Sequence, residues 1–246
     1  MKPVLIAAAA WAAIAITPGV AAQSSSEKNG PWHNTVEVTE RGHLVGDPDA
    51  ETRLIEFVSY TCSTCAAFAR QGDPALDYAF LSPGHVQLEI RPVIRNKLDV
   101  TVSLLVACGD TPDKFKRNHS MFLLSQREWL DKAVSAPRSQ QAIWARGDSA
   151  SRVNMASALG LDDMMRDRRG YSASEINRCL RDDAKADKLD ADDDANRLEY
   201  PIPGTPTFAI DGTVLPGVFT WETLYPALSD AVKAKWNAKL NPESQP

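Results

Sequence analysis

The sequence predicts an α/β fold in which one sheet is interrupted by a block of helices. Three observations support this prediction. A short apolar run leads into a helical segment that begins with two cysteines, a long stretch with helical spacing follows, and strand signals return near the C-terminus. Strands and helices on both sides of a purely helical block are typical of a single α/β domain that carries an insertion.

The first unit is a strand, a helix and a second strand. Residues Arg53 to Ser59 form a nearly continuous apolar run, as expected for a strand that is buried on both faces. Residues 62–80 have helical spacing, and residues 86–94 alternate like a strand. Cys62 and Cys65 therefore lie at the first turn of a β-α-β unit.

The sequence pattern becomes helical after Asn96 and stays so to about Leu198. Within this block, Ser172 and Glu175 match a capping box, which marks the start of a helix. The acidic run from Asp182 to Asp194 lacks the glycine and glutamate that a calcium loop needs, so we interpret it as a solvated helix face.

Strand signals return at residues 205–210. Asp211-Gly212 predicts a tight hairpin turn, and Val214-Leu215 predicts the returning strand. A final helix is indicated by apolar residues spaced four apart, at Leu224, Leu228 and Val232.

The N-terminus has the pattern of a signal peptide. Lys2 precedes an apolar run from Val4 to Ile16, and the small residues Val20 and Ala22 predict cleavage after Ala22. We therefore expect a signal peptide at 1–22, a flexible leader at 23–35 and a periplasmic or otherwise exported protein, with no membrane insertion after cleavage. An uncleaved membrane anchor is the alternative.

Composition excludes some classes of partner. The chain has 27 basic and 32 acidic residues and a net charge of -5. It offers no general positive field for nucleic acid or anionic lipid. Four cysteines are too few to staple a fold of this size, so their positions carry the information.

The Cys62-Ser63-Thr64-Cys65 motif predicts redox chemistry. A thiolate at the start of a helix faces the positive end of the helix dipole and unpaired N–H groups, which lower its pKa. We therefore expect Cys62 to be the nucleophile and Cys65, one turn deeper, to be the resolving thiol. Half of a zinc site and an inert structural bridge are the alternatives, but the sequence offers no second such pair to complete a zinc site.

Two motifs together carry a family resemblance. Glu56-Phe57 stands six positions before Cys62, and Gly204-Thr205-Pro206-Thr207-Phe208 follows the helical block. Over about Val36 to Trp236, the chain resembles the DsbA-like branch of the thioredoxin superfamily. The resemblance implies a thioredoxin fold with residues 36–98 as its first part, a helical insertion at 99–199, a second part at 200–239 and a tail at 240–246.

The same resemblance implies thiol-disulfide exchange on exported proteins. Neither a cofactor nor a metal is expected. The implied partners are unfolded or reduced exported proteins and a membrane or soluble redox partner. Because the chain has no separate dimerisation domain of the kind that related isomerases use, we favour an oxidase, with isomerase or reductase activity as the alternative.

Glu56 interrupts a strand that is otherwise apolar, and a buried carboxyl costs free energy unless it has a partner or a role. By resemblance, it is the buried acid that accepts the proton of Cys65, with a pKa raised by burial. An exposed or salt-bridged residue is the alternative.

The other site residues come from the resemblance and from the motif itself. Thr205 and Pro206 are implied to bind substrate beside the cysteines, through a cis bond that leaves Thr205 free to pair with an extended segment. Ser63 and Thr64 tune the potential. Because they supply no cation to the thiolate, we expect a milder oxidant than relatives with Pro-His at these positions.

Cys108 and Cys179 are candidates for a structural disulfide. Both lie on apolar faces of predicted helices, and export supplies an oxidising environment. Two separate buried thiols are the alternative. For the protein as a whole, a non-enzymatic chaperone or a binder of a soft metal such as Cu(I) remains the competing function class.

Overall fold

The computed structural model describes residues 31–109, 111 and 113–241. The predicted signal peptide, most of the predicted leader and residues 242–246 of the predicted tail lie outside the described residues. No described helix is both long enough and apolar enough to cross a membrane.

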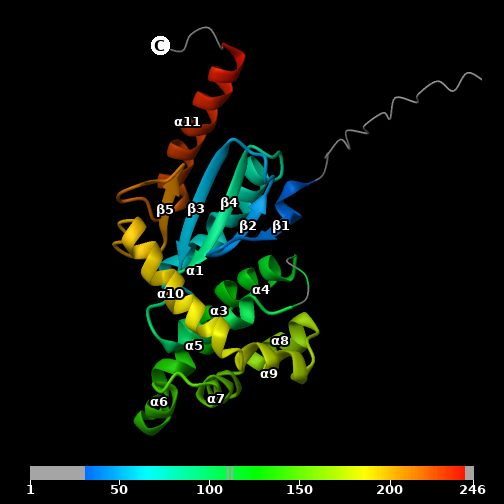
Figure 1. The fold of residues 1–246 in the computed structure, drawn as a ribbon, viewed down its shortest axis with the longest axis vertical. Coiled ribbons are helices and arrows are strands. Elements are labelled where there is room, and N and C mark those ends of the chain that lie inside the picture. Colours follow the sequence, from blue (N-terminus) through cyan, green and yellow to red (C-terminus); the bar gives the residue numbers. More distant parts are fainter. Residues whose placement is uncertain (1–30, 110, 112, 242–246) are drawn as a thin grey trace, which may run out of the picture.

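Six strands form one mixed sheet at the centre of the fold (Figure 1). They are β1 (Val36–Val38), β2 (His43–Gly46), β3 (Thr52–Val58), β4 (Val86–Pro92), β5 (Thr207–Ile210) and β6 (Thr213–Val214). Their order across the sheet is β1-β2-β4-β3-β5-β6. The parallel pairing of β3 with β4 confirms the predicted β-α-β unit, and the antiparallel pairing of β3 with β5 joins the two ends of the chain in one sheet.

Most of the other described residues lie in helices. These helices are η1 (Trp32–Asn34), α1 (Ser63–Gln71), α2 (Asp73–Leu76), the π-helical turn η2 (Asp77–Leu81), α3 (Lys97–Val106), α4 (Asp113–Leu124), α5 (Gln126–Ser135), α6 (Arg138–Trp144), α7 (Ser149–Leu159), α8 (Leu161–Arg169), α9 (Ala173–Leu180), α10 (Asp183–Glu199) and α11 (Trp221–Leu240). Between β4 and β5 the described chain is helical, so a helical insertion interrupts the thioredoxin-like sheet as predicted.

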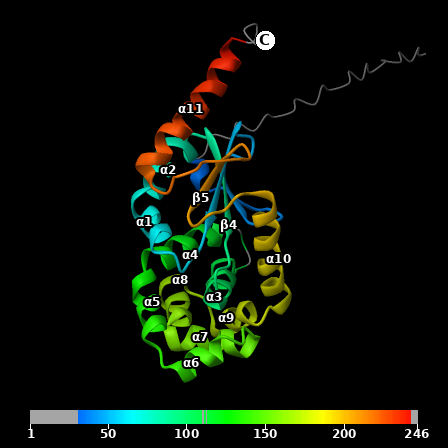
Figure 2. The same cartoon turned by 90° about the vertical axis from the view of Figure 1, so that its left-hand side faces the viewer.

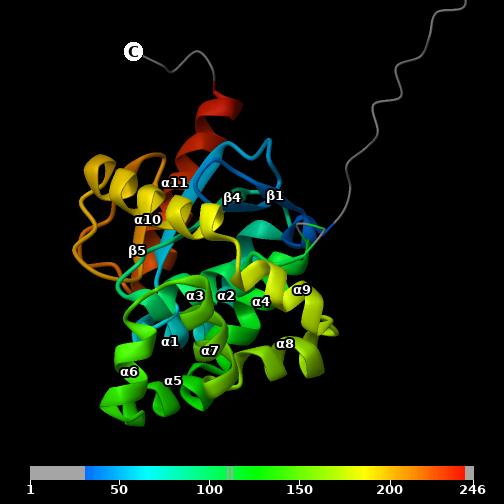
Figure 3. The same cartoon turned by 60° about the horizontal axis from the view of Figure 1, so that its bottom comes forward.

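The helices form two layers and a separate block. Figure 2 shows α1, α2 and α11 on one face of the sheet and α10 on the other. Helices α3 to α9 gather beyond one end of the sheet (Figure 3). The start of α1 therefore lies where the sheet meets the helical block.

The alternation along β3 assigns its side chains to the two faces. Leu54 and Val58 belong to the main core, which also holds Cys65 of α1, whereas Ile55 and Phe57 belong to a smaller core on the opposite face. Successive strand residues point to opposite faces. Glu56 therefore points toward α1, on the face that carries the cysteines.

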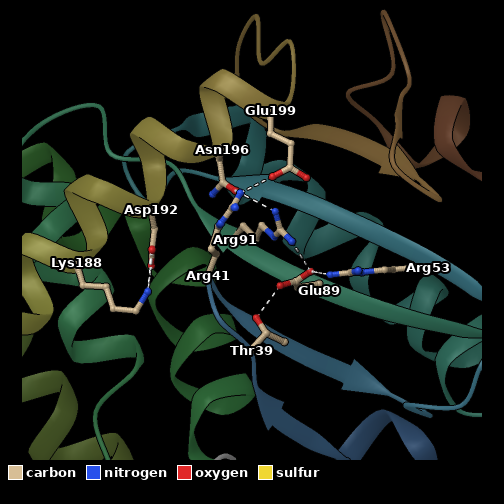
Figure 4. A network of polar contacts seen from close by, with 9 residues as sticks. All are labelled: Thr39, Arg41, Arg53, Glu89, Arg91, Lys188, Asp192, Asn196 and Glu199. Carbon is tan, nitrogen blue, oxygen red and sulfur yellow. Dashed lines mark hydrogen bonds and ion pairs between the residues drawn. The ribbon is translucent and has the colours of Figure 1, made fainter.

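A polar network fixes α10 to the far face of the sheet (Figure 4). Arg91 of β4 donates to Asn196 Oδ1 at 2.9 Å and to Glu89 Oε2 at 2.9 Å. Arg41, before β2, pairs with Glu199 and donates to Asn196. The last turns of α10 are thus held by two arginines from the sheet region.

Several local predictions are confirmed. Ser172 and Glu175 form the capping box at the start of α9. Asp211 and Gly212 adopt positive φ angles of 49° and 83° in the turn between β5 and β6. In α11, Leu224 and Leu228 are fully buried. Two-residue hairpin turns favour positive φ angles, which glycine and aspartate adopt readily, so Asp211 and Gly212 suit the turn between β5 and β6.

Two expectations need correction. Residues 32–34 were expected in a flexible leader, but they form the turn η1, where Lys116 donates to the His33 carbonyl at 2.8 Å. The acidic run is mainly a solvated face of α10, but Asp193 within it is buried and accepts from Arg197 at 3.0 Å. A carboxylate tolerates burial there because a guanidinium pairs with it.

Candidate active site

Cys62 ends the turn that links β3 to α1. Its amide donates to the Ser59 carbonyl at 3.2 Å, and its own carbonyl accepts from the Ala66 amide at 3.2 Å. Cys62 is therefore the residue that caps α1, where the first N–H groups of the helix have no helical partner. Its residue exposure is 7%, whereas Cys65, one turn further, is completely buried.

Asp99 of α3 holds this turn in place. Its carboxylate accepts from the Ser59 hydroxyl at 2.9 Å, the Thr61 amide at 3.0 Å and the Thr61 hydroxyl at 3.0 Å. The Asp99 side chain is fully buried, so these bonds are protected from water. We infer that Asp99 is a positioning residue for the turn that carries Cys62.

Gln126 of α5 supports the same turn from the other side. Its amide nitrogen donates to the carbonyls of Tyr60 at 2.7 Å and Cys62 at 2.9 Å. The Tyr60 hydroxyl in turn lies 3.0 Å from His119 Nδ1. The insertion thus contributes directly to the geometry of the cysteine motif. Sequence reasoning identified neither Asp99 nor Gln126.

The two cysteines are unbridged, and their thiols are strongly differentiated. A hydrogen bond from the Cys65 thiol is the main cause that lowers the pKa of Cys62 from 9.0 to about 5. Partial burial opposes this shift, while the Thr205 side chain and the amides of Cys65 and Thr64 add to it. The predicted low pKa therefore has a broader cause than the helix terminus alone.

Cys65 shows the opposite behaviour. Burial raises its pKa well above 9.0, and the hydrogen bond that it donates to Cys62 raises it further. The charges of Cys62 and Glu56 act in the same direction. In the reduced site, these shifts favour a thiolate at Cys62 and a protonated thiol at Cys65.

Glu56 lies in the core on the face of β3 that carries the cysteines. It is 1% exposed, and its Oε2 has no hydrogen-bond partner among the described residues. Burial raises its pKa well above 4.5, and the negative charge of Asp73 adds to that effect. Burial thus favours the protonated form of Glu56, and the charge of the ionised form raises the pKa of Cys65, so the two groups are linked electrostatically.

Asp73 is a second acid that sequence reasoning missed. It is half-buried at the start of α2, and burial raises its pKa from 3.8 to about 7. Asp77 raises this pKa further, while Lys116 lowers it. The Asp-Pro dipeptide at positions 73 and 74 signals only a helix start, so its sequence gives no hint of a link to Glu56.

Thr205 lies directly beside Cys62, and Pro206 follows it, immediately before β5. The Thr205-Pro206 bond is cis, as expected, and the Cys62 sulfur lies 3.0 Å from the Thr205 carbonyl, to which the thiol donates when it is protonated. A groove of about 540 Å³ runs past this pair. It is lined by residues 61–64 and 202–205, together with Val93, Arg95 and Arg197.

Ser63 and Thr64 are exposed on the rim of this groove. Within the described part of the chain, neither hydroxyl forms a hydrogen bond to Cys62. The Thr64 backbone amide does contribute to the lowered Cys62 pKa. The contribution of Thr64 to the Cys62 pKa thus comes from its backbone amide, and a tuning role for the two side chains stays a prediction.

Cys108 and Cys179 form a disulfide, with their Cα atoms 5.7 Å apart. Cys108 follows α3 and is 3% exposed, while Cys179 lies in α9. The bridge joins the loop after α3, and not a helix face as expected for Cys108, to α9, and neither cysteine lines the groove beside Cys62. Among the described residues, no group of three or more His, Cys, Asp or Glu side chains is arranged to hold a metal ion.

The comparison with known families identifies the chain. A family model described as thioredoxin matches residues 38–230. The chain belongs to the thioredoxin family. The Cys62-Cys65 pair at the start of α1 and the helical insertion make it DsbA-like, and its relatives mark it as a thiol-disulfide oxidoreductase.

Individual relatives agree with this assignment. The crystal structure of a protein-disulfide isomerase from Novosphingobium aromaticivorans has a TM-score of 0.73 and 35% identity, and the match covers 77% of this chain and 96% of that one. Wolbachia pipientis alpha-DsbA1 has a TM-score of 0.64 at 19% identity, over 80% of this chain and 93% of that one, which shows a shared fold.

A curated Rickettsia conorii protein is also similar. Its name gives protein-disulfide oxidoreductase as a provisional activity. It is 22% identical over 221 residues, which span 88% of this chain and 71% of that protein.

Proposed function

We propose that this protein is an exported dithiol oxidase that introduces disulfides into reduced proteins outside the cytoplasm. One observation carries the proposal: Cys62 caps α1 while Cys65 is completely buried one turn further, and this arrangement lowers the pKa of Cys62 to about 5 and raises that of Cys65 well above 9.0. A stabilised Cys62 thiolate favours the reduced form of the enzyme, so the Cys62–Cys65 disulfide readily accepts electrons.

In the proposed reaction, a client thiolate attacks Cys62 Sγ of the oxidised enzyme. The Cys62–Cys65 bond breaks, a mixed disulfide forms, and Cys65 leaves as a thiolate that takes a proton from Glu56. A second client thiolate then attacks the client sulfur of the mixed disulfide, and Cys62 leaves as the stabilised thiolate. The client loses two electrons and gains one disulfide, and the enzyme is reduced by two electrons.

A second turnover requires reoxidation. A membrane or soluble redox partner must accept the two electrons while Cys65 loses its proton to Glu56, which can act as a base once it is ionised. Export is supported by the signal-like pattern at residues 1–22, and it would place the enzyme where disulfides persist.

Oxidative refolding of a reduced protein tests the proposal. Oxidised enzyme should form disulfides in reduced ribonuclease with stoichiometric loss of its own disulfide, and Cys62→Ser should abolish this reaction. An active Cys62→Ser variant, or activity only with added copper, would favour a chaperone or metal-binding role.

Isomerase activity is the second candidate, because the Novosphingobium relative at 35% identity is described as a protein-disulfide isomerase. Scrambled ribonuclease separates the two. An oxidase acts faster on the reduced protein, whereas an isomerase restores activity to the scrambled protein and needs its own cysteines reduced. The reduction potential gives an independent measure, because a value near that of thioredoxin, about -270 mV, would contradict an oxidase.

A further inference from the structure

The groove beside Cys62 carries two arginines. Arg95 follows β4 and Arg197 lies near the end of α10, and both line the groove together with Thr205. Among the described residues, the lining contains no aspartate or glutamate. This stands out in a chain whose net charge is -5.

Arg197 has donors left to offer a ligand. Its Nε donates to Asp193 at 3.0 Å, and its side chain is 42% exposed. The described residues provide no partner for its two terminal nitrogens. Guanidinium carries five N–H donors in a planar fork that matches a carboxylate. The pair with Asp193 therefore fixes the stem of Arg197 and leaves the end of the fork for a second carboxylate.

The backbone around Arg197 is held by the network drawn in Figure 4. Asn196 accepts from Arg91 at 2.9 Å, and Glu199 pairs with Arg41. These contacts flank Arg197 in the sequence and anchor α10 to the sheet. A recognition residue that is held on a rigid element loses less entropy when it binds a ligand.

Arg95 is fixed to the active-site turn in a similar way. Its backbone amide donates to Asp99 Oδ2 at 3.1 Å, and the same carboxylate accepts from the Thr61 amide. The Arg95 side chain is exposed and forms no ion pair with any described residue. The Asp99 carboxylate thus holds the backbone of both Arg95 and the turn that carries Cys62. The Arg95 guanidinium remains available to bind a ligand.

The two carboxylates near the groove are buried beneath its surface. Asp99 is fully buried and accepts hydrogen bonds from the active-site turn, and Asp193 is 5% exposed and paired with Arg197. These two carboxylates offset the long-range field of the arginines. Selection must then come from direct contact with the guanidinium groups and not from steering at a distance.

We propose that this groove selects client segments that carry a carboxylate close to the reacting cysteine. Such a segment would lie extended against Thr205. An aspartate or glutamate on the side of its cysteine away from Thr205 would accept hydrogen bonds from Arg95 or Arg197. This inference rests on the proposed function, because it names the class of substrate that the Cys62 site prefers.

Three reduced peptides of equal length test the inference. Each has two cysteines, flanked by glutamate, glutamine or lysine, and the oxidation of each by oxidised enzyme is followed in a stopped-flow instrument. Exposed ion pairs contribute modestly, so we expect the glutamate peptide to react about threefold to tenfold faster than the glutamine peptide, and the lysine peptide to react most slowly.

Variants assign the effect to the two arginines. In Arg95→Gln/Arg197→Gln, the ratio between glutamate and glutamine peptides should fall to near one. Adding Asp193→Asn removes the carboxylate that the change at Arg197 would leave unpaired, so this triple variant keeps the test valid if the first is unstable. Arg138→Gln, an exposed arginine at the start of α6 in the helical block, is the matched control and should keep the full ratio.

Equal rates for the three peptides with wild-type enzyme, or an unchanged ratio in the arginine variants, would overturn the inference. Failure of the proposed function looks different: none of the peptides would be oxidised, whatever its charge.

Discussion

The Cys62 thiol donates a 3.0 Å hydrogen bond to the carbonyl of Thr205, although 143 residues separate the two in the sequence. The strand that begins after Thr205 pairs with the strand that leads into Cys62. The antiparallel register of these strands thus brings Thr205 to Cys62. The Thr205 side chain makes a separate contact, a hydrogen bond to the Cys62 sulfur that lowers the pKa of Cys62.

We expect the pKa of Cys62 to be about 5, because Cys65, Thr205 and two backbone amides donate to the thiolate. Thiolate absorbance against pH should show one transition near that value, with no second transition below 9. A Cys62 pKa near the free-thiol value of about 8.5 would contradict the proposed mechanism. Thr205→Val removes one of these donors, so its transition should move to higher pH.

This shift also predicts how the stability of the reduced enzyme depends on pH. The folded pKa of Cys62 is depressed, so the folded state releases its proton earlier than the unfolded state does. The resulting stabilisation is fully present above about 9 and is lost as the pH falls through about 5. Denaturant titrations of reduced and oxidised enzyme should therefore diverge as the pH rises across this window.

Glu56→Gln should leave the fold intact and slow the steps in which Cys65 gains or loses a proton. Glutamine keeps the size of the side chain but cannot transfer a proton, and general acid-base catalysis contributes roughly 100-fold or more. We expect a loss on the order of tenfold to a hundredfold in stopped-flow rates near neutral pH. Glu222→Gln, an exposed residue of α11, is the control. Equal rates for wild type and Glu56→Gln would assign Glu56 a structural role only.

Asp73→Asn should stabilise the protein at pH 8 but not at pH 4. The folded pKa of Asp73 is raised to about 7 from 3.8, so the folded state binds more protons than the unfolded state between these values. Stability therefore falls as the pH rises through this window, and the neutral amide escapes that loss. Because Asp73 is only half-buried, we expect a gain of about 1 to 2 kcal/mol. The same gain at both pH values would show that another interaction is responsible.

The elements that depend on short stretches of sequence could be predicted from the sequence alone. The strand before Cys62, the helix that begins there and the turn at Asp211-Gly212 each follow from residues within a few positions. The hairpin of β1 and β2 was missed, because strands of three and four residues give no clear alternation. Short strands of this kind depend on their pairing partners and not on intrinsic preference.

The supports of the site could not be predicted for a related reason. Asp99 is 38 residues from Thr61, and Gln126 is 64 residues from Cys62, yet each bonds directly to the active-site turn. A single sequence does not record contacts across such separations. The motif therefore singled out Cys62 and Cys65 as candidates, whereas the residues that hold them became visible only in the fold.

The last prediction concerns the disulfide between Cys108 and Cys179. It closes a loop with a sequence separation of 71, and the chain-entropy model assigns a bridge of that length about 4 kcal/mol. Cys108→Ala/Cys179→Ala should therefore lower the free energy of unfolding by about that amount and Tm by roughly 10 °C. Peptide oxidation at 25 °C should be unaffected, since the bridge lies within the insertion and its sulfurs do not line the groove beside Cys62. Mass mapping of the non-reduced protein gives a direct check. Two free thiols outside the Cys62 pair, or a double variant that unfolds like wild type, would contradict a stabilising bridge.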